Sequence, residues 1–155
     1  MRKIEPFIQQ LNHHTDLPTK KMLNNLVDRK RKFDGYKDKC FKAQLFTFTI
    51  LIGFIVYLYV YIIQPSGGQI EFVISSIFDG ELHLFIVLLI VAGYATAKYY
   101  KKKEDKAEKE FHALRCEVIS KSSELWPQPT RWEKRHDVFA MMKNEYDINL
   151  FHESK

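Results

Sequence analysis

Residues Leu45–Ile63 read LFTFTILIGFIVYLYVYII, a run of nineteen residues without a charged side chain. At about 1.5 Å per residue, an α-helix of this run is roughly 28 Å long, close to the hydrocarbon thickness of a bilayer, which is about 30 Å. The run has no polar stripe, which disfavours the amphipathic helix of a soluble protein. Its second half carries Tyr57, Tyr59 and Tyr61, and tyrosine favours the membrane interface. We therefore predict a transmembrane helix rather than a buried core helix.

A second apolar run, LHLFIVLLIVAGYATA, lies at Leu82–Ala97. It is shorter than the first run, but Lys98 can extend its ammonium towards the headgroups, so that the helix continues through Tyr99–Tyr100. His83 lies near the outer end of this run, where a neutral imidazole costs little. We predict a second transmembrane helix over residues 82–100.

The distribution of basic residues predicts the orientation of both spans. No lysine or arginine occurs between Lys42 and Lys98, although the chain contains 24 of them. A soluble domain needs charges on every exposed face, whereas lysine and arginine gather in the cytoplasmic loops of membrane proteins. The segment that connects the two runs has none. We predict a multi-pass membrane protein with both termini in the cytoplasm.

These inferences define an all-α fold, a transmembrane helical hairpin with cytoplasmic N- and C-terminal helices. The expected segments are a cytoplasmic N-terminal helical arm (1–44), the first span (45–63), an extracytoplasmic loop (64–81), the second span (82–100) and a cytoplasmic C-terminal helical region (101–155). Within the loop, the apolar segment Ile70–Phe78 is expected in the outer interface, as a short helix or an extended piece.

Small residues indicate where the two spans touch. Apolar side chains gain nothing by leaving lipid, so transmembrane helices pair where small residues let their backbones approach. The first span offers Thr49 and Gly53, and the second offers Gly93 and Ala97. These residues lie at similar depths in an antiparallel hairpin, and we predict that they form the helix–helix contact. The alternative is that small residues occur there by chance.

Both cytoplasmic arms carry short patterns typical of a coiled coil. Apolar residues recur at 3-4 spacing before the first span and after the second, with lysines in some positions. These stretches can pair as an antiparallel extension of the hairpin, dimerise between chains, or stay solvated as amphipathic helices. The positions are Leu23, Leu26, Lys30, Phe33, Lys37 and Cys40 in the first arm and Phe111, Leu114, Val118, Lys121 and Leu125 in the second.

The C-terminal region contains a proline-rich break followed by another helical stretch. The segment Trp126-Pro127-Gln128-Pro129 ends the preceding helix, because proline cannot continue one. A further helix is expected from about Thr130 to Glu145. An apolar face larger than this region can bury would mark a partner site. The candidates for contact with a partner are Trp126, Trp132, Phe139 and Met142.

Residue types that bind metals or catalyse reactions are scattered along the chain. His13-His14 and Asp16 lie in loop-like sequence without the spacing that prepositions metal ligands. His112 and Cys116 are four residues apart and would need Cys40 from the other arm to approach a metal site. The chain has no Walker loop, GxSxG, HExxH or Rossmann fingerprint. We expect no enzymatic activity, no metal site and no cofactor.

The tail reads ELW…RHDVFAMMKNEYDINLFHESK, and its most informative residues are Trp126, Arg135-His136, Val138-Phe139, Met142-Lys143 and Ile148-Asn149-Leu150. With the two spans and their basic flanks, this tail resembles the YpbF-like family, small membrane proteins of spore-forming Gram-positive bacteria whose function is not established. The resemblance implies a bacterial plasma membrane and supplies no catalytic residues.

The sequence thus favours an integral membrane protein of the structural or interaction class, which presents a cytoplasmic helical platform. The expected partners are the lipid bilayer, a second copy of the chain and an unidentified cytoplasmic protein, with no nucleic acid and no small-molecule substrate. The alternative is a holin-type pore-former assembled from the two spans. A pore should collapse the membrane potential on expression, and a structural protein should not.

Overall fold

The computed structural model describes residues 4–11, 15–127 and 130–152, and these residues form helices and connecting turns without a β-strand. The all-α prediction is confirmed in this part of the chain. Two helices are long and apolar enough to cross a membrane, one over Leu17–Ile63 and one over Glu81–Ser120. The elements are α1 (Pro6–Gln9), α2 (Leu17–Leu58), the π-helical η1 (Tyr59–Ile63), α3 (Ile70–Asp79), α4 (Glu81–Ser120), α5 (Ser122–Leu125) and α6 (Thr130–Tyr146).

The chain divides into two compact units. One unit, the helical head, combines Met1–Gly35 with Asp105–Lys155, and the other, the hairpin unit, comprises Tyr36–Glu104. The N-terminal arm and the C-terminal region, which the sequence placed in separate segments, therefore share one unit. Both α2 and α4 contribute residues to both units without a helix break.

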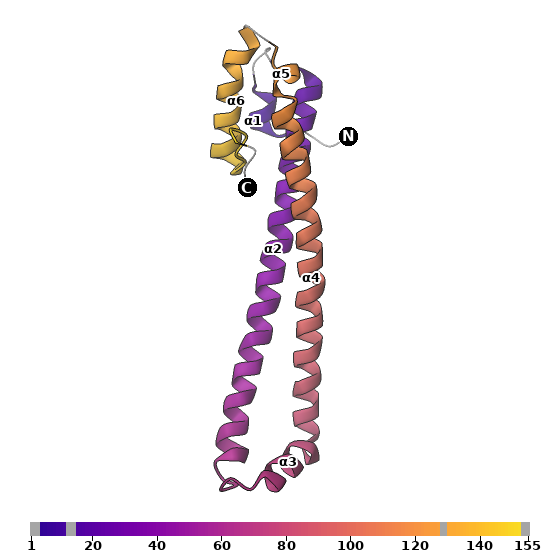
Figure 1. The fold of residues 1–155 in the computed structure, drawn as a ribbon, viewed down its shortest axis with the longest axis vertical. Coiled ribbons are helices and arrows are strands. Elements are labelled where there is room, and N and C mark those ends of the chain that lie inside the picture. The colour runs from indigo at the N-terminus through magenta and orange to yellow at the C-terminus, as the bar shows by residue number, and fades with distance from the viewer. Residues whose placement is uncertain (1–3, 12–14, 128–129, 153–155) are drawn as a thin grey trace. The chain divides into compact units, whose positions relative to one another are not determined.

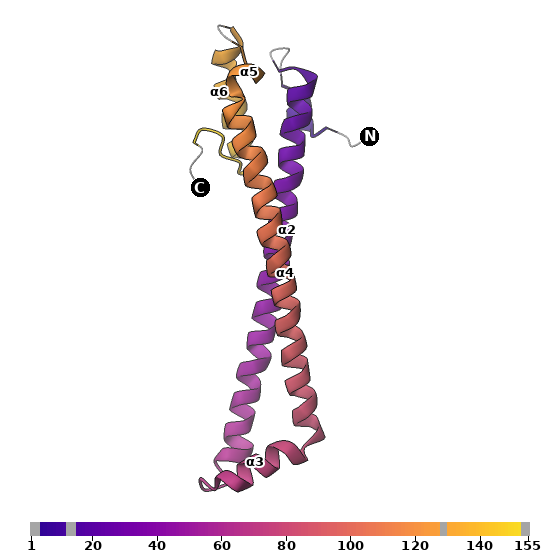
Figure 2. The same ribbon diagram turned by 45° about the vertical axis from the view of Figure 1, so that its right-hand side comes forward.

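Within the hairpin unit, α2 and α4 run antiparallel and are joined through α3 (Figure 1). The turn after η1 uses Gly67 and Gly68, whose φ angles of 57° and 87° suit glycine. The apolar loop segment then forms α3, which crosses from the end of η1 to the start of α4 (Figure 2). Of the two conformations expected for this segment, the structure adopts the helix.

The apolar side chains of the hairpin unit point mostly outward. Only 11% of the most apolar eighteen-residue window of each long helix is buried. A core helix of a soluble protein would bury most of such a window. The exposed side chains form a surface that we call the apolar belt, and its members include Phe46, Phe48, Ile52, Ile55, Val56, Phe85, Leu88 and Val91.

The less exposed positions of the hairpin unit form a regular seam. They recur at steps of three and four residues on both helices, which is the spacing of coiled-coil packing. On α4 the same spacing continues without interruption into the head, as far as Val118. The seam positions are Cys40, Ala43, Thr47, Ile50, Phe54 and Tyr57 on α2, and His83, Ile86, Ile90, Gly93, Ala97 and Tyr100 on α4.

The helical head has a closed hydrophobic core. The two heptad-like stretches pair within one chain, since the rings of Phe33 and Phe111 stack with centroids 6.3 Å apart. Nearby, Arg29 Nη1 donates to the Glu110 carbonyl at 2.7 Å. The buried members of this core are Ile8, Leu23, Leu26, Val27, Phe111, Leu114, Val118, Trp126, Val138, Phe139, Met142, Ile148 and Leu150.

The chain reverses after α6 so that its last apolar residues reach this core. Asp147 adopts a left-handed backbone with φ of 55°, and the Ile148 N–H donates back to the Met142 carbonyl at 3.0 Å. The guanidinium of Arg115 then holds the returning segment, because its Nε donates to the Asn149 carbonyl at 2.6 Å. Helix α6 matches the expected helix to within one residue at its end.

Candidate functional site

The two apolar helices approach each other closely at Gly93. A Cβ atom placed on Gly93 would lie 2.5 Å from Thr47 Oγ1, which is shorter than any normal contact. One turn further along α4, Ala97 is buried, and its carbonyl accepts from the Cys40 thiol at 3.8 Å. The structure therefore places Gly93 and Ala97 in the helix–helix contact, opposite Thr47 and Cys40.

Thr49 and Gly53 lie outside this contact, which corrects the sequence prediction for these two residues. Thr49 is exposed, and its hydroxyl donates to the Leu45 carbonyl of its own helix at 2.9 Å. A Cβ atom on Gly53 would meet no other atom within 4 Å. The physical reason is register, since the steps of three and four that start at Cys40 pass through Thr47 and miss both predicted residues.

At the other end of the hairpin unit, near α3, α2 and α4 lie farther apart (Figure 1). His83 is buried there, and its Nε2 lies 3.1 Å from the Tyr57 hydroxyl. The ring of Phe54 lies 6.3 Å from the His83 ring. The sequence indicated only that a neutral imidazole at His83 has a low free-energy cost near the membrane interface. It did not predict that His83 contacts Tyr57 on the facing helix.

Three of the four candidates for partner contact are core residues of the head, and this part of the prediction is corrected. Trp126 and Met142 have no exposed surface, and Phe139 is 4% exposed. The Trp126 and Phe139 rings meet edge to face at 5.7 Å. The fourth candidate, Trp132, stays half-buried, with the Arg135 guanidinium 3.7 Å above its ring. The head thus buries three of the apolar side chains that were expected to remain exposed for a partner.

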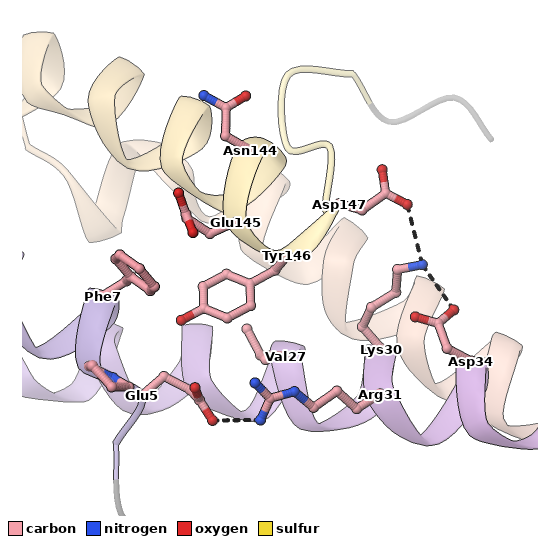
Figure 3. Close-up of a pocket in the computed structure, with 11 residues that line it drawn as sticks. Glu5, Phe7, Val27, Lys30, Arg31, Asp34, Asn144, Glu145, Tyr146 and Asp147 are labelled. Carbon is pink, nitrogen blue, oxygen red and sulfur yellow. Dashed lines mark hydrogen bonds and ion pairs between the residues drawn. The ribbon is translucent and has the colours of Figure 1, made fainter.

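An open pocket of about 550 Å³ lies in the head where α1 and the end of α6 meet α2 (Figure 3). Charged side chains of both signs line it and pair with one another. Arg31 binds Glu5 at 2.5 Å, and Glu5 raises the pKa of Arg31 by accepting this hydrogen bond. Lys30 lies 3.0 Å from Asp34 and 3.6 Å from Asp147. These pairs explain how a lysine can occupy an apolar position of the heptad-like pattern. The Lys30 side chain extends its ammonium to two carboxylates.

Tyr146 lies in the same pocket, with its ring between Phe7 and Val27 (Figure 3). Its hydroxyl oxygen is buried without a hydrogen-bond partner among the described residues. Burial raises the pKa of Tyr146, and the negative charge of Glu5 raises it further, while Arg31 acts in the opposite direction. The sequence marks Tyr146 as a residue that the last helix can bury, and the pocket that holds its hydroxyl is completed by α1, a helix of only four residues.

This raised pKa predicts a loss of stability at alkaline pH. A phenol whose pKa is higher in the folded state stabilises the fold fully below its unfolded value of about 10. That contribution is lost as pH rises through the folded-state pKa. We expect Tyr146→Phe to remove this alkaline loss from unfolding curves measured between about pH 8 and pH 11. Tyr99→Phe, at an exposed tyrosine, is the control, and parallel losses in parent and Tyr146→Phe would contradict the prediction.

The candidate metal ligands are not brought together. Cys116 is exposed, Cys40 is buried in the hairpin unit, and His112 Nε2 lies 3.8 Å from Glu108. Among the described residues, no three histidine, cysteine or acidic side chains are grouped as a metal site requires. His13 and His14 lie outside the described residues. Their neighbour Asp16 accepts a paired hydrogen bond from Arg131, at 3.0 and 2.9 Å.

A comparison with known protein families shows the family to which the chain belongs. Residues 22–153 match the family described as "protein of unknown function (DUF2663)". The chain belongs to the DUF2663 family. It is similar to the "uncharacterized protein YpbF" of Bacillus subtilis (strain 168), with 41% identity over 152 residues that cover 98% of this chain and 100% of that protein. The resemblance inferred from the tail is thereby confirmed.

The DUF2663 match begins within α2 and includes α3, α4 and α6, so both units contribute to the family pattern. No solved structure matches the chain.

Proposed function

We propose that this chain is an integral membrane protein of the structural or interaction class, in which two transmembrane helices hold a helical head at the cytoplasmic face. The apolar belt carries this proposal. Its side chains are exposed in an isolated chain, and a continuous apolar surface of this size needs a nonpolar environment. The hydrocarbon of a bilayer provides one along the length of both helices.

The polar surface of the head supports the same proposal. In contrast to the hairpin unit, it leaves few large apolar side chains exposed among its described residues, namely Phe7, Leu17 and Phe151. Charged residues cover it, and several form ion pairs between elements, such as Arg31 with Glu5 and Arg131 with Asp16. A surface of this kind suits water, and the lysines on both flanks of the apolar belt favour the cytoplasmic side.

The head offers one aromatic feature for a cytoplasmic partner. Trp132 is half-buried on α6, and the Arg135 guanidinium covers its ring. Tryptophan and arginine are the residue types enriched where protein interfaces gain most of their binding energy. We propose this pair, rather than the buried Trp126, Phe139 or Met142, as the place where a partner protein docks.

The holin-type alternative gains no support from the hairpin unit. A pore needs polar groups that face its lumen. The span hydroxyls of Thr47, Thr49 and Thr96 donate instead to carbonyls of their own helices, at 2.8, 2.9 and 2.8 Å. Structural anchoring is therefore the better account of the two helices.

Cysteine labelling tests insertion and orientation together. We expect Gln69→Cys, in the turn before α3, to react with a membrane-impermeant thiol reagent in intact cells, since that turn is proposed to lie outside. Ala113→Cys, at an exposed position of α4 in the head, should react only after the membrane is opened. Both variants are made without Cys40 and Cys116. Labelling of both sites in intact cells, or of Ala113→Cys alone, would contradict the proposed topology.

A further inference from the structure

A groove of about 420 Å³ runs along the hairpin unit on one side of the contact between α2 and α4. Its walls are formed by Ala43 and Phe46 from α2 and by Gly93 and Thr96 from α4. The groove exists because Gly93 has no side chain and lets α4 approach Thr47 closely. It is thus built by the same small residue that forms the helix contact.

The walls of the groove offer a ligand almost no free polar group. The hydroxyls of Thr47 and Thr96 are both used within their own helices, where they donate to the carbonyls of Ala43 and Ala92 at 2.8 Å. The remaining wall is methyl, methylene and aromatic surface. Such a groove suits a hydrocarbon chain rather than a polar molecule.

The mouth of the groove has the opposite character. Lys39 and Lys42 line it, both of them exposed, together with Tyr100. Asp38 lies 2.7 Å from Lys42 Nζ, but both side chains of this pair are largely exposed, and such pairs are weak enough to exchange partners. Lys39 Nζ lies 5.8 Å from the centre of the Tyr36 ring and faces no acidic group there. Two ammonium groups are therefore available beside an apolar slot.

We propose that this groove binds one anionic phospholipid of the cytoplasmic leaflet. An acyl chain lies against Phe46, Gly93 and Thr96, and Lys39 and Lys42 bind the phosphate. This inference rests on the proposed membrane insertion, which places the apolar walls in hydrocarbon and the lysines at headgroup depth. Charge complementarity and an apolar slot on the same element pair select a lipid over a soluble phosphate.

The test uses the full-length protein in detergent, titrated with phosphatidylglycerol or with phosphatidylcholine of the same acyl chains. Native mass spectrometry counts the lipids that stay bound. We expect one retained phosphatidylglycerol in preference to phosphatidylcholine. The double variant Lys39→Gln/Lys42→Gln should lower that preference by about thirtyfold, since each basic residue near a headgroup contributes about fivefold. Thr96→Leu, which fills the slot, should lower the retention of both lipids.

Matched controls separate this site from general attraction. Lys102→Gln/Lys103→Gln removes the same charge from exposed positions that do not line the groove, and Thr49→Leu repeats the Thr96 change on an exposed face of α2. Equal losses in the test and control variants, or no preference for phosphatidylglycerol in the parent, would overturn the lipid site. Carbonate extraction of the parent from membranes tests insertion separately. A chain that resists extraction but fails the lipid test removes this inference and leaves the proposed function standing.

Discussion

Replacing Gly93 by leucine is expected to lower the free energy of unfolding of the hairpin unit by about 1–3 kcal/mol, the usual cost of forcing bulk into a packed contact. The new side chain would enter at the position where a Cβ atom already lies 2.5 Å from Thr47 Oγ1. The Cγ2 and Cβ atoms of Thr47 lie at 3.3 and 3.4 Å from the same position, so rotating the hydroxyl away does not make room for a leucine. Unfolding in mixed detergent micelles, followed by circular dichroism, measures the change.

The matched control is Gly53→Leu, the same substitution on the facing helix. Gly53 has no atom within 4 Å of its Cβ position, so the added side chain extends outward and stability should stay within experimental error. Equal destabilisation by the two variants would mean that the loss comes from helix properties common to both glycines. A silent Gly93→Leu would show that the two helices do not approach each other at this point.

Replacing Trp126 by alanine is expected to cost the head about 3–5 kcal/mol, the range for truncating a large buried aromatic residue. Trp126 has no exposed surface and meets Phe139 edge to face at 5.7 Å. Its loss opens a cavity next to α6, because the proline that follows it restricts how far the backbone can collapse. Thermal unfolding of the full chain and the rate of proteolysis within the head both report this loss.

Trp132→Ala is the control for this experiment. It removes the same side chain from the same short region, but Trp132 is only half-buried and contacts Arg135. Its cost should lie near that of an ordinary surface substitution, within about 0.5–1 kcal/mol. If Trp132→Ala destabilised the head as much as Trp126→Ala, the core would have to be centred on α6 rather than on the junction before it.

The apolar runs made the two long apolar helices predictable from sequence, because nineteen uncharged residues in the first run and sixteen in the second allow few other structures. The pairing of the arms was one of several options, and the choice could be made only from the fold. Leu23, Leu26, Phe111 and Val118 belong to one buried core of the head, so the two arms pair within this unit. The 3-4 spacing of apolar residues identifies which face of a helix is buried, but not which other helix packs against that face.

The errors at Gly53 and Trp126 have different physical causes. Gly53 was selected by residue size, whereas the 3-4 spacing that starts at Cys40 decides which residues face the partner helix, and Thr47 satisfies it. That signal was present in the sequence. The burial of Trp126 was not predictable in the same way, because the core that it joins includes Ile148 and Leu150, which reach it only after the left-handed turn at Asp147.

The unbroken register of α4 limits how the family can vary in length. Positions from His83 to Val118 follow one succession of three- and four-residue steps, with no glycine or proline at which the phase could be reset except Gly93 itself. One inserted residue turns everything beyond it by about 100° around the helix axis, whereas seven turn it by only about 20°. Relatives should therefore lengthen or shorten this helix in whole heptads, while insertions of any size collect in the turn around Gly67 and Gly68.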